Sequence, residues 1–189
     1  VVNNRDTESS LLGLVRPGEL NREISYIGRG IFETNDKRLR LGISGIWLNT
    51  SYDPTKLRSP LELGPGALEF TPVIFSAQYN SERWTLTSEY AIRPFSYDRN
   101  FKNTRLDGQH FVGESYYFQG EYRFTPNWEG FLRYDALFID RSDRDGSDWV
   151  AKNPGGRSGL GHSRFAKDIA VGIRWNVTPA FMLRAEYHH

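Results

Sequence analysis

Charged side chains recur at every second position along several stretches of the sequence, and this spacing is the clearest chemical signal in the chain. Glu121 is followed two residues later by Arg123, and Arg133 by Asp135. Residues two apart lie on the same face of a β-strand, so one face of each predicted strand would carry charges of both signs. Such a face can line water and select solutes by their charge. The residues of this predicted polar face are Arg29, Arg38, Arg40, Glu89, Arg93, Glu121, Arg123, Glu129, Arg133, Asp135, Asp168, Arg174, Arg184 and Glu186.

Two interpretations of this polar face stay open at the level of sequence. If the face lines an open passage, its excess of arginine over carboxylate predicts a preference for anionic solutes. If the passage is narrow, the same charges pair and fill it, because about eight strands enclose little more than side chains. Arg123 and Arg133 are the best candidates for selectivity, since they lie on adjacent predicted strands, with Glu121 and Asp135 supplying the opposite sign.

Other chemistry has less support in the sequence. The acidic stretch DRSDRDGSD, residues 140–148, resembles a calcium loop, but counting back from Gly146 puts Arg141 at the first ligand position. A solvated loop is therefore the better prediction. The chain has no cysteine, and nothing brings its four histidines together. We therefore expect no metal site and no cofactor. No serine lies beside a histidine on a predicted strand face, so we expect no enzyme.

The stretch Ser115–Ile139 shows how these charges are positioned. Apolar and aromatic residues alternate with polar ones on both sides of Thr125-Pro126-Asn127, a pattern typical of two antiparallel strands joined by a tight turn. Each strand is long for a soluble protein, where five or six residues is common. About ten residues suffice to cross a bilayer at a tilt of about 45°.

The same alternation predicts eight strands, joined in turn by short turns and long loops. Transmembrane barrels show this asymmetry, whereas loops this long are uncommon in compact soluble domains. Pro72 is expected to weaken the beginning of the third strand. The predicted strands cover residues 23–33, 38–49, 71–79, 84–93, 115–124, 128–139, 165–177 and 181–187, with long loops at 1–21, 50–67, 96–114 and 140–163.

Aromatic residues gather at both ends of the predicted strands, on the face opposite the charges. Smaller apolar residues lie between them, as expected where rings meet lipid headgroups. The predicted membrane girdle comprises Trp47, Tyr79, Trp84, Tyr116, Phe124, Trp128, Trp175 and Phe181.

The composition is compatible with this interpretation. Net charge is +1, which gives no support to nucleic-acid binding. Mean hydropathy is −0.58, but only alternate residues of a membrane strand need to be apolar. No apolar run approaches the roughly 18 residues of a spanning helix.

The phrases EYRFTPNWEGFLRYD and GIRWNVTPAFMLRAEY resemble strand–turn–strand units of bacterial outer-membrane β-barrels of the porin type. The resemblance implies an all-β, antiparallel transmembrane barrel forming one domain over residues 1–189. It also implies a bacterial outer-membrane location and passive diffusion of small polar solutes. The expected partners are outer-membrane lipid and those solutes, and a homo-oligomer is compatible with the pattern.

The predicted topology indicates whether this sequence would contain all the strands of a barrel. The first strand runs toward the Asn35-Asp36 turn and the last runs away from Thr178-Pro179, so both ends of the strand series would lie on the long-loop side. The resemblance instead implies periplasmic termini and a terminal aromatic residue, whereas this sequence ends Tyr187-His188-His189. We therefore expect an internal segment of a larger barrel. The alternatives are a small plugged structural or adhesive barrel, and a soluble β-sandwich that stacks sugars on its aromatic rings.

Overall fold

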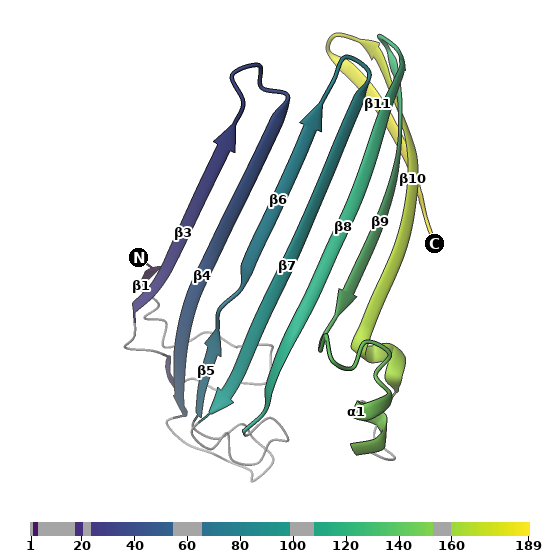
Figure 1. Ribbon diagram of the computed structural model, residues 1–189. Helices are drawn as coiled ribbons and strands as arrows, with labels where there is room; N and C mark the ends of the chain where they lie inside the picture. Colours follow the sequence, from purple (N-terminus) through teal and green to yellow (C-terminus); the bar gives the residue numbers. More distant parts are fainter. Residues whose placement is uncertain (1, 4–17, 21–23, 55–65, 99–107, 153–159) are drawn as a thin grey trace. The chain divides into compact units, whose positions relative to one another are not determined.

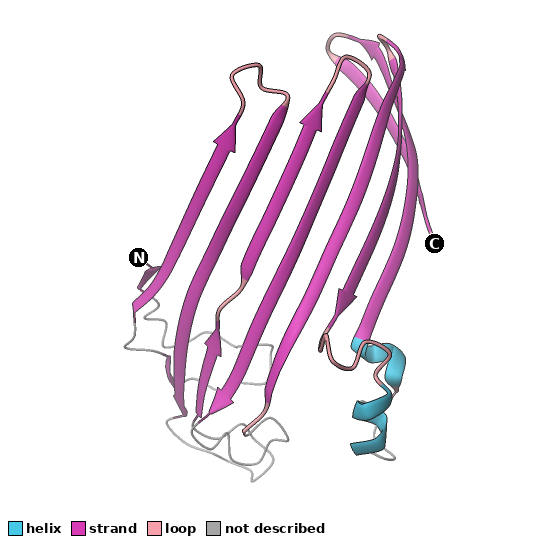
Figure 2. Ribbon diagram, in the orientation of Figure 1, coloured by secondary structure: helices cyan, strands magenta, loops and turns pink. Residues whose placement is uncertain are grey.

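In the computed structural model, the chain is an antiparallel β protein with almost no helix (Figure 2). The structure describes residues 2–3, 18–20, 24–54, 66–98, 108–152 and 160–189. Its strands are β1 (Val2–Asn3), β2 (Gly18–Leu20), β3 (Ile24–Glu33), β4 (Leu39–Pro54), β5 (Gly66–Phe70), β6 (Val73–Asn80), β7 (Trp84–Asp98), β8 (His110–Thr125), β9 (Trp128–Phe138), β10 (Phe165–Thr178) and β11 (Phe181–His188). Its helices are α1 (Ser147–Lys152) and the 3-10 helix η2 (Gly161–Arg164).

The strands of the described residues form one sheet. Its main path runs β1-β3-β4-β5-β7-β8-β9-β10-β11, while β2 pairs with β4, and β6 pairs with both β4 and β7 (Figure 1). Strands β5 and β6 therefore occupy one place in the sheet, separated by Thr71 and Pro72. The Thr71 N–H donates to the Pro94 carbonyl (3.2 Å) and the Ile46 N–H to the Pro72 carbonyl (3.1 Å). The break falls where proline removes a donor from the ladder.

Several predicted loop boundaries were wrong. Strand β4 continues to Pro54, β7 continues to Asp98 and β8 begins at His110, all within predicted loops. The predicted loops 1–21 and 140–163 contain β1 and β2, and α1 and η2 respectively. The physical reason is that a backbone ladder does not require alternating side chains, so pairing continues after the apolar alternation has ended.

The chain divides into two compact units. Unit 1 comprises Val1–Gly28, Ser44–Val73 and Arg93–Val112, and unit 2 comprises Arg29–Ile43, Ile74–Ile92 and Gly113–His189.

Unit 1 is held together by paired strands and stacked rings. Phe70 pairs with Leu48 on one side and with Phe95 on the other. The ring centroids of Phe70 and Phe95 lie 4.4 Å apart, and those of Phe95 and Phe111 lie 5.1 Å apart. Tyr97 stacks beside them. These aromatic contacts fix neighbouring strands against one another.

Unit 2 contains the long antiparallel ladder of β8, β9, β10 and β11. From Phe165 to Trp175, each residue of β10 has a direct partner on β9. Directly paired residues share a face of the sheet. One face therefore carries Phe118, Tyr134 and Ile169 side by side, and Leu132 lies next to Val171. We call this the apolar face of unit 2, and the opposite side its polar face.

Few hydrophobic side chains of the sheet are buried. Among the described residues, the buried hydrophobic side chains are Ala67, Ala136, Phe138 and Ala170. Leu132 remains 59% exposed and Phe118 58% exposed. The sheet therefore gains its stability from the ladder and from neighbouring side chains on each face, and its apolar face lies open.

Close packing does occur where a large ring lies over a glycine. A Cβ added to Gly172 on β10 would come within 2.6 Å of Phe131 Cζ and 2.8 Å of the Ala185 carbonyl oxygen. Phe131 therefore lies across the polar side of β10, where only glycine leaves room for it.

Gly172→Ala should destabilise the folded chain by about 1–3 kcal/mol, because the ring of Phe131 must move to admit the methyl group. Gly28→Ala is the matched control, since a Cβ at that strand position meets nothing within 4 Å. Equilibrium urea unfolding, followed by tryptophan fluorescence, would measure both. Equal free energies of unfolding in the two variants would contradict the packing argument.

Candidate functional site

The polar face of unit 2 brings most of the predicted charged residues into four rows that cross β8 to β11. Within a row, residues are direct partners on neighbouring strands; between rows, they are two apart along one strand. Counted from the short turns, the rows are Arg123–Glu129–Arg174–Arg184, Glu121–Phe131–Gly172–Glu186, Gln119–Arg133–Ala170–His188 and Tyr117–Asp135–Asp168. The sign of the charge thus alternates from row to row.

Glu129 holds the first row together. Its carboxylate lies 3.0 Å from the Arg174 guanidinium and 3.9 Å from that of Arg123. The Glu129 side chain is only 14% exposed, whereas that of Arg123 is 53% exposed. One carboxylate therefore serves two arginines on the strands to either side, and the row keeps a net positive charge.

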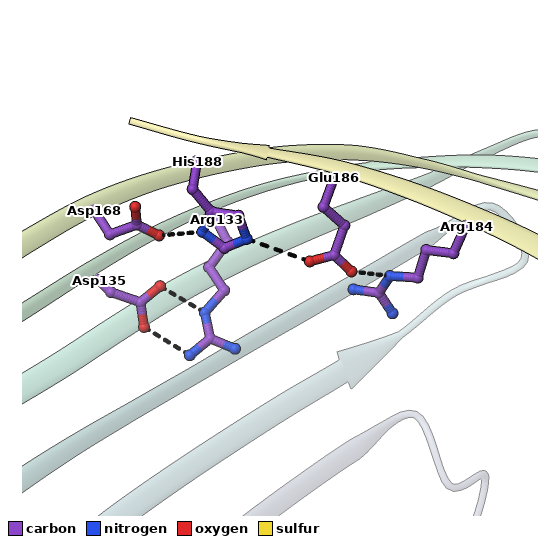
Figure 3. A network of polar contacts seen from close by, with 6 residues as sticks. All are labelled: Arg133, Asp135, Asp168, Arg184, Glu186 and His188. Carbon is purple, nitrogen blue, oxygen red and sulfur yellow. Dashed lines mark hydrogen bonds and ion pairs between the residues drawn. The ribbon is translucent and has the colours of Figure 1, made fainter.

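Arg133 makes the best-formed ion pair of the face. Its Nε and Nη2 groups donate to the two carboxylate oxygens of Asp135 at 2.7 and 2.6 Å (Figure 3). The guanidinium also lies over the Tyr117 ring, 4.1 Å from the centroid. Bidentate pairing and stacking fix the orientation of the arginine.

His188 joins β11 to β10. Its Nδ1 lies 2.7 Å from Asp168 Oδ2, and its Nε2 lies 3.4 Å from Glu186, which also pairs with Arg184 (Figure 3). His188 alternates with Arg184 and Glu186 in the sequence, but it was not included among the charged residues of the predicted polar face.

The remaining predicted residues take less central positions. Arg29 is exposed on β3, Arg40 lies 3.9 Å from Glu33, and Arg93 is half-buried in unit 1. Glu121 accepts a hydrogen bond from Gln119. Arg38 was placed in a strand by the sequence analysis, but it precedes β4 and pairs with Asp36 in the turn at 3.6 Å.

Glu89 lines a hollow of about 420 Å³ on the polar face of unit 2. Tyr117, Arg133, Asp135 and Asp168 line the same hollow. A hollow of this size between charged groups can hold water or a small polar solute.

The apolar face carries the predicted aromatic residues beside the short turns. The rings of Trp128 and Trp175 stack, with their centroids 5.1 Å apart and an angle of 5° between their planes. The ring centroids of Trp84 and Tyr122 lie 4.5 Å apart. The ring of Phe124 lies over Gly130. Tyr79, before the β6–β7 turn, and Phe181, after the β10–β11 turn, are exposed.

Two predicted girdle residues lie nearer the long loops. Trp47 stacks on Tyr26 and donates from Nε1 to Glu69. Tyr116 lies 6.5 Å from Tyr90 and 6.3 Å from Phe138, centroid to centroid. An open hollow of about 1170 Å³ extends over the apolar side chains of unit 2, on the side away from the ion pairs.

The structure corrects one expectation about serine and histidine. Ser96 Oγ lies 2.9 Å from His110 Nδ1 on neighbouring strands of unit 1, a pair that the sequence analysis did not find. The pair is exposed. A hydrogen bond in water does not by itself activate a serine, which needs an oriented base in a protected site.

The carboxylates of the acidic stretch hold the loop's own backbone. Asp140 accepts hydrogen bonds from Ser142, and Asp143 accepts them from the N–H groups of Asp148 and Trp149 at the start of α1. Asp145 accepts from the N–H and the hydroxyl of Ser147 at 3.1 and 2.8 Å. These bonds hold the pKa of Asp145 below its ordinary value. Over the described ranges, no three metal-binding side chains converge.

Comparison with protein-family models, with curated proteins and with solved structures yields no match. In the part of the chain that the structure describes, neither helix is long or apolar enough to cross a membrane.

Acidification should loosen the loop that Asp145 holds. A carboxylate whose pKa is lowered by folding contributes its full stability above its ordinary pKa of about 3.9. That contribution is lost as the pH falls through the lowered value. The ¹⁹F NMR signal of 5-fluorotryptophan at Trp149 would report the change, because its N–H is fixed by the same loop.

5-Fluorotryptophan at Trp175, within the β10 ladder, is the control. Its chemical shift should stay constant as the pH is lowered from neutral through the ordinary aspartate pKa and below it, while that of Trp149 changes. Equal constancy of the two signals would contradict the role given to Asp145.

Proposed function

We propose that this chain forms part of a transmembrane β-barrel in a bacterial outer membrane, and that the barrel is a channel for passive diffusion of small polar solutes. The observation that carries the proposal is the contrast between the two faces of unit 2. Each long strand presents exposed apolar side chains on one face and charged side chains on the other. That contrast matches a wall with lipid on one side and water on the other.

The exposed apolar face supports a lipid environment. Apolar surface left in water costs about 25 cal/mol per Å², and a protein that functions in water rarely leaves such a continuous face uncovered. Lipid would cover it without a second sheet. A backbone in lipid must satisfy its hydrogen bonds internally, which the ladder of β8 to β11 does for the strands between its edges.

The polar face supports a water-filled lumen. Its ion pairs are partly exposed, with Arg133 and Asp135 at 37% and 33%, so water reaches charges that are already paired. The four rows carry four arginines and five carboxylates. An anion preference would therefore depend on Arg29, Arg40 and Arg93, or on strands beyond these rows.

The edges of the sheet support a larger assembly. Among the described residues, β11 pairs with β10 alone, and beyond Ile24 and Ser25 β3 has no strand partner other than β4. Open edges are not tolerated in lipid. Further strands, or another copy of the chain, would close the barrel.

The ion pairs also favour a second candidate, a plugged structural barrel whose charges neutralise one another in a closed interior. Conductance measured on the intact protein distinguishes the open channel from the plugged barrel.

The strand lengths argue against a soluble sugar-binding sandwich, because β4, β7, β8 and β10 each exceed the usual five or six residues.

Leu132→Arg should destabilise the membrane-inserted protein by about 2–4 kcal/mol if the residue faces lipid near the midplane. Thr87→Arg is the control, because Thr87 lies on the other face from the exposed Leu86. Urea titrations of protein folded in phosphatidylcholine vesicles would compare them. Equal tolerance of both arginines, or failure of the intact protein to enter vesicles, would argue against a lipid-facing surface.

Arg133→Glu should shift the permeability of the intact protein toward cations, because it replaces a positive charge on the lumen wall with a negative one. Reversal potentials in planar bilayers under a salt gradient would measure the shift. Lys152→Glu makes the same change on the exposed helix α1 and should leave selectivity nearly unchanged. Absence of any conductance in the intact protein would favour the plugged barrel.

A further inference from the structure

A group of cations and rings lies at the rim of the apolar face of unit 2, at its long-loop end. Register places Lys167 beside Ala136 and Tyr116, in line with Ile169 and Val171 on the same face of β10. The next row toward the loops contains Phe138 and Phe165. Lys167 is thus the first charged residue that follows the apolar series of β10.

The cations lie on the aromatic rings of this rim. Lys167 Nζ lies 5.5 Å from the Phe165 centroid and 5.8 Å from that of Phe138. The Arg144 guanidinium lies 5.3 Å from the Phe138 centroid. Phe138 is only 3% exposed, while Arg144 and Lys167 are exposed, so the two cationic groups lie between an aromatic ring and solvent. Long basic side chains adopt this arrangement between apolar surface and water.

A buried carboxylate holds Arg144 in place. Glu114 is 4% exposed; its Oε2 lies 2.6 Å from Arg144 Nη2, and its Oε1 accepts the Tyr90 hydroxyl at 2.8 Å. These hydrogen bonds connect the loop after β9 to β7 and β8 on the apolar side of the sheet. It also neutralises one cation of the group.

Lys167 differs from Arg144 in having no ion-pair partner among the described residues. The residue is exposed. The neighbouring carboxylates of Asp140 and Asp143 accept hydrogen bonds within their own loop and act on Arg164, which lies over the Trp149 ring. Lys167 is therefore the cation of this rim that is left available to an anion among the described residues.

We propose that Lys167 and Arg144 form a binding site for the phosphate of an anionic lipid headgroup. The inference rests on the proposed membrane location of the apolar face. With the acyl chains against Ile169 and Val171, the headgroup would lie at the height of Lys167. A phosphate there would accept charge-assisted hydrogen bonds from Lys167 and Arg144, and such cations draw anionic lipid to a protein surface.

Native mass spectrometry of the intact protein in detergent would test the site by titration with phosphatidylglycerol and with phosphatidylcholine. The wild type should bind phosphatidylglycerol more tightly. Lys167→Gln should weaken that binding about fivefold, as expected for the loss of one basic contact. Lys152→Gln, an equal charge change on α1, should leave it unchanged.

Three results would overturn the proposal: equal affinity of the wild type for the two lipids, equal effects of the two substitutions, or full competition by millimolar inorganic phosphate, which would indicate a site for free phosphate. Entry of the wild type into phosphatidylcholine vesicles is measured separately. Failure there would remove the membrane location itself, whereas entry without a phosphatidylglycerol preference would remove only this site.

Discussion

The backbone ladder that joins β8, β9, β10 and β11 is the constraint on which the rest of the structure depends. It keeps one register along β9 and β10 from Phe138 and Phe165 to Trp128 and Trp175. Because successive side chains point to opposite faces, a slip of one residue would exchange the two faces of a strand. Every grouping of side chains in unit 2, apolar or charged, follows from that register.

The same ladder explains why this sheet needs so small a buried core. Its side chains are stabilised mostly by neighbours on their own face, as in the stacking of Trp128 on Trp175 and of Phe131 over Gly172. Its charges likewise find partners on their own side, through Glu129 and Asp135. A sheet built in this way can meet a different solvent on each face, and this property underlies the channel proposal.

The alternation of apolar and polar residues in the sequence predicts those structural features that depend on residues two positions apart. It predicted β9 to within one residue, and it placed Arg133 and Asp135, which form an ion pair, on one face of that strand. It could not predict the length of β4, β7 and β8, because backbone pairing continues where the side-chain pattern stops. Nor could it predict the contact of Glu114 with Arg144, thirty residues away, since that contact depends on how the loop after β9 folds back.

The ion pairs within single strands have a consequence for how such a wall could change in evolution. Arg133 finds its counter-ion in Asp135, and Arg184 finds its own in Glu186, both on the same strand. A strand that carries its own counter-ions is nearly neutral as a unit. Duplicating or exchanging such a strand would move these two pairs as units, whereas Glu129 on β9 would still be needed by Arg123 and Arg174 on the neighbouring strands. The sheet could then gain a strand with little change in its net charge.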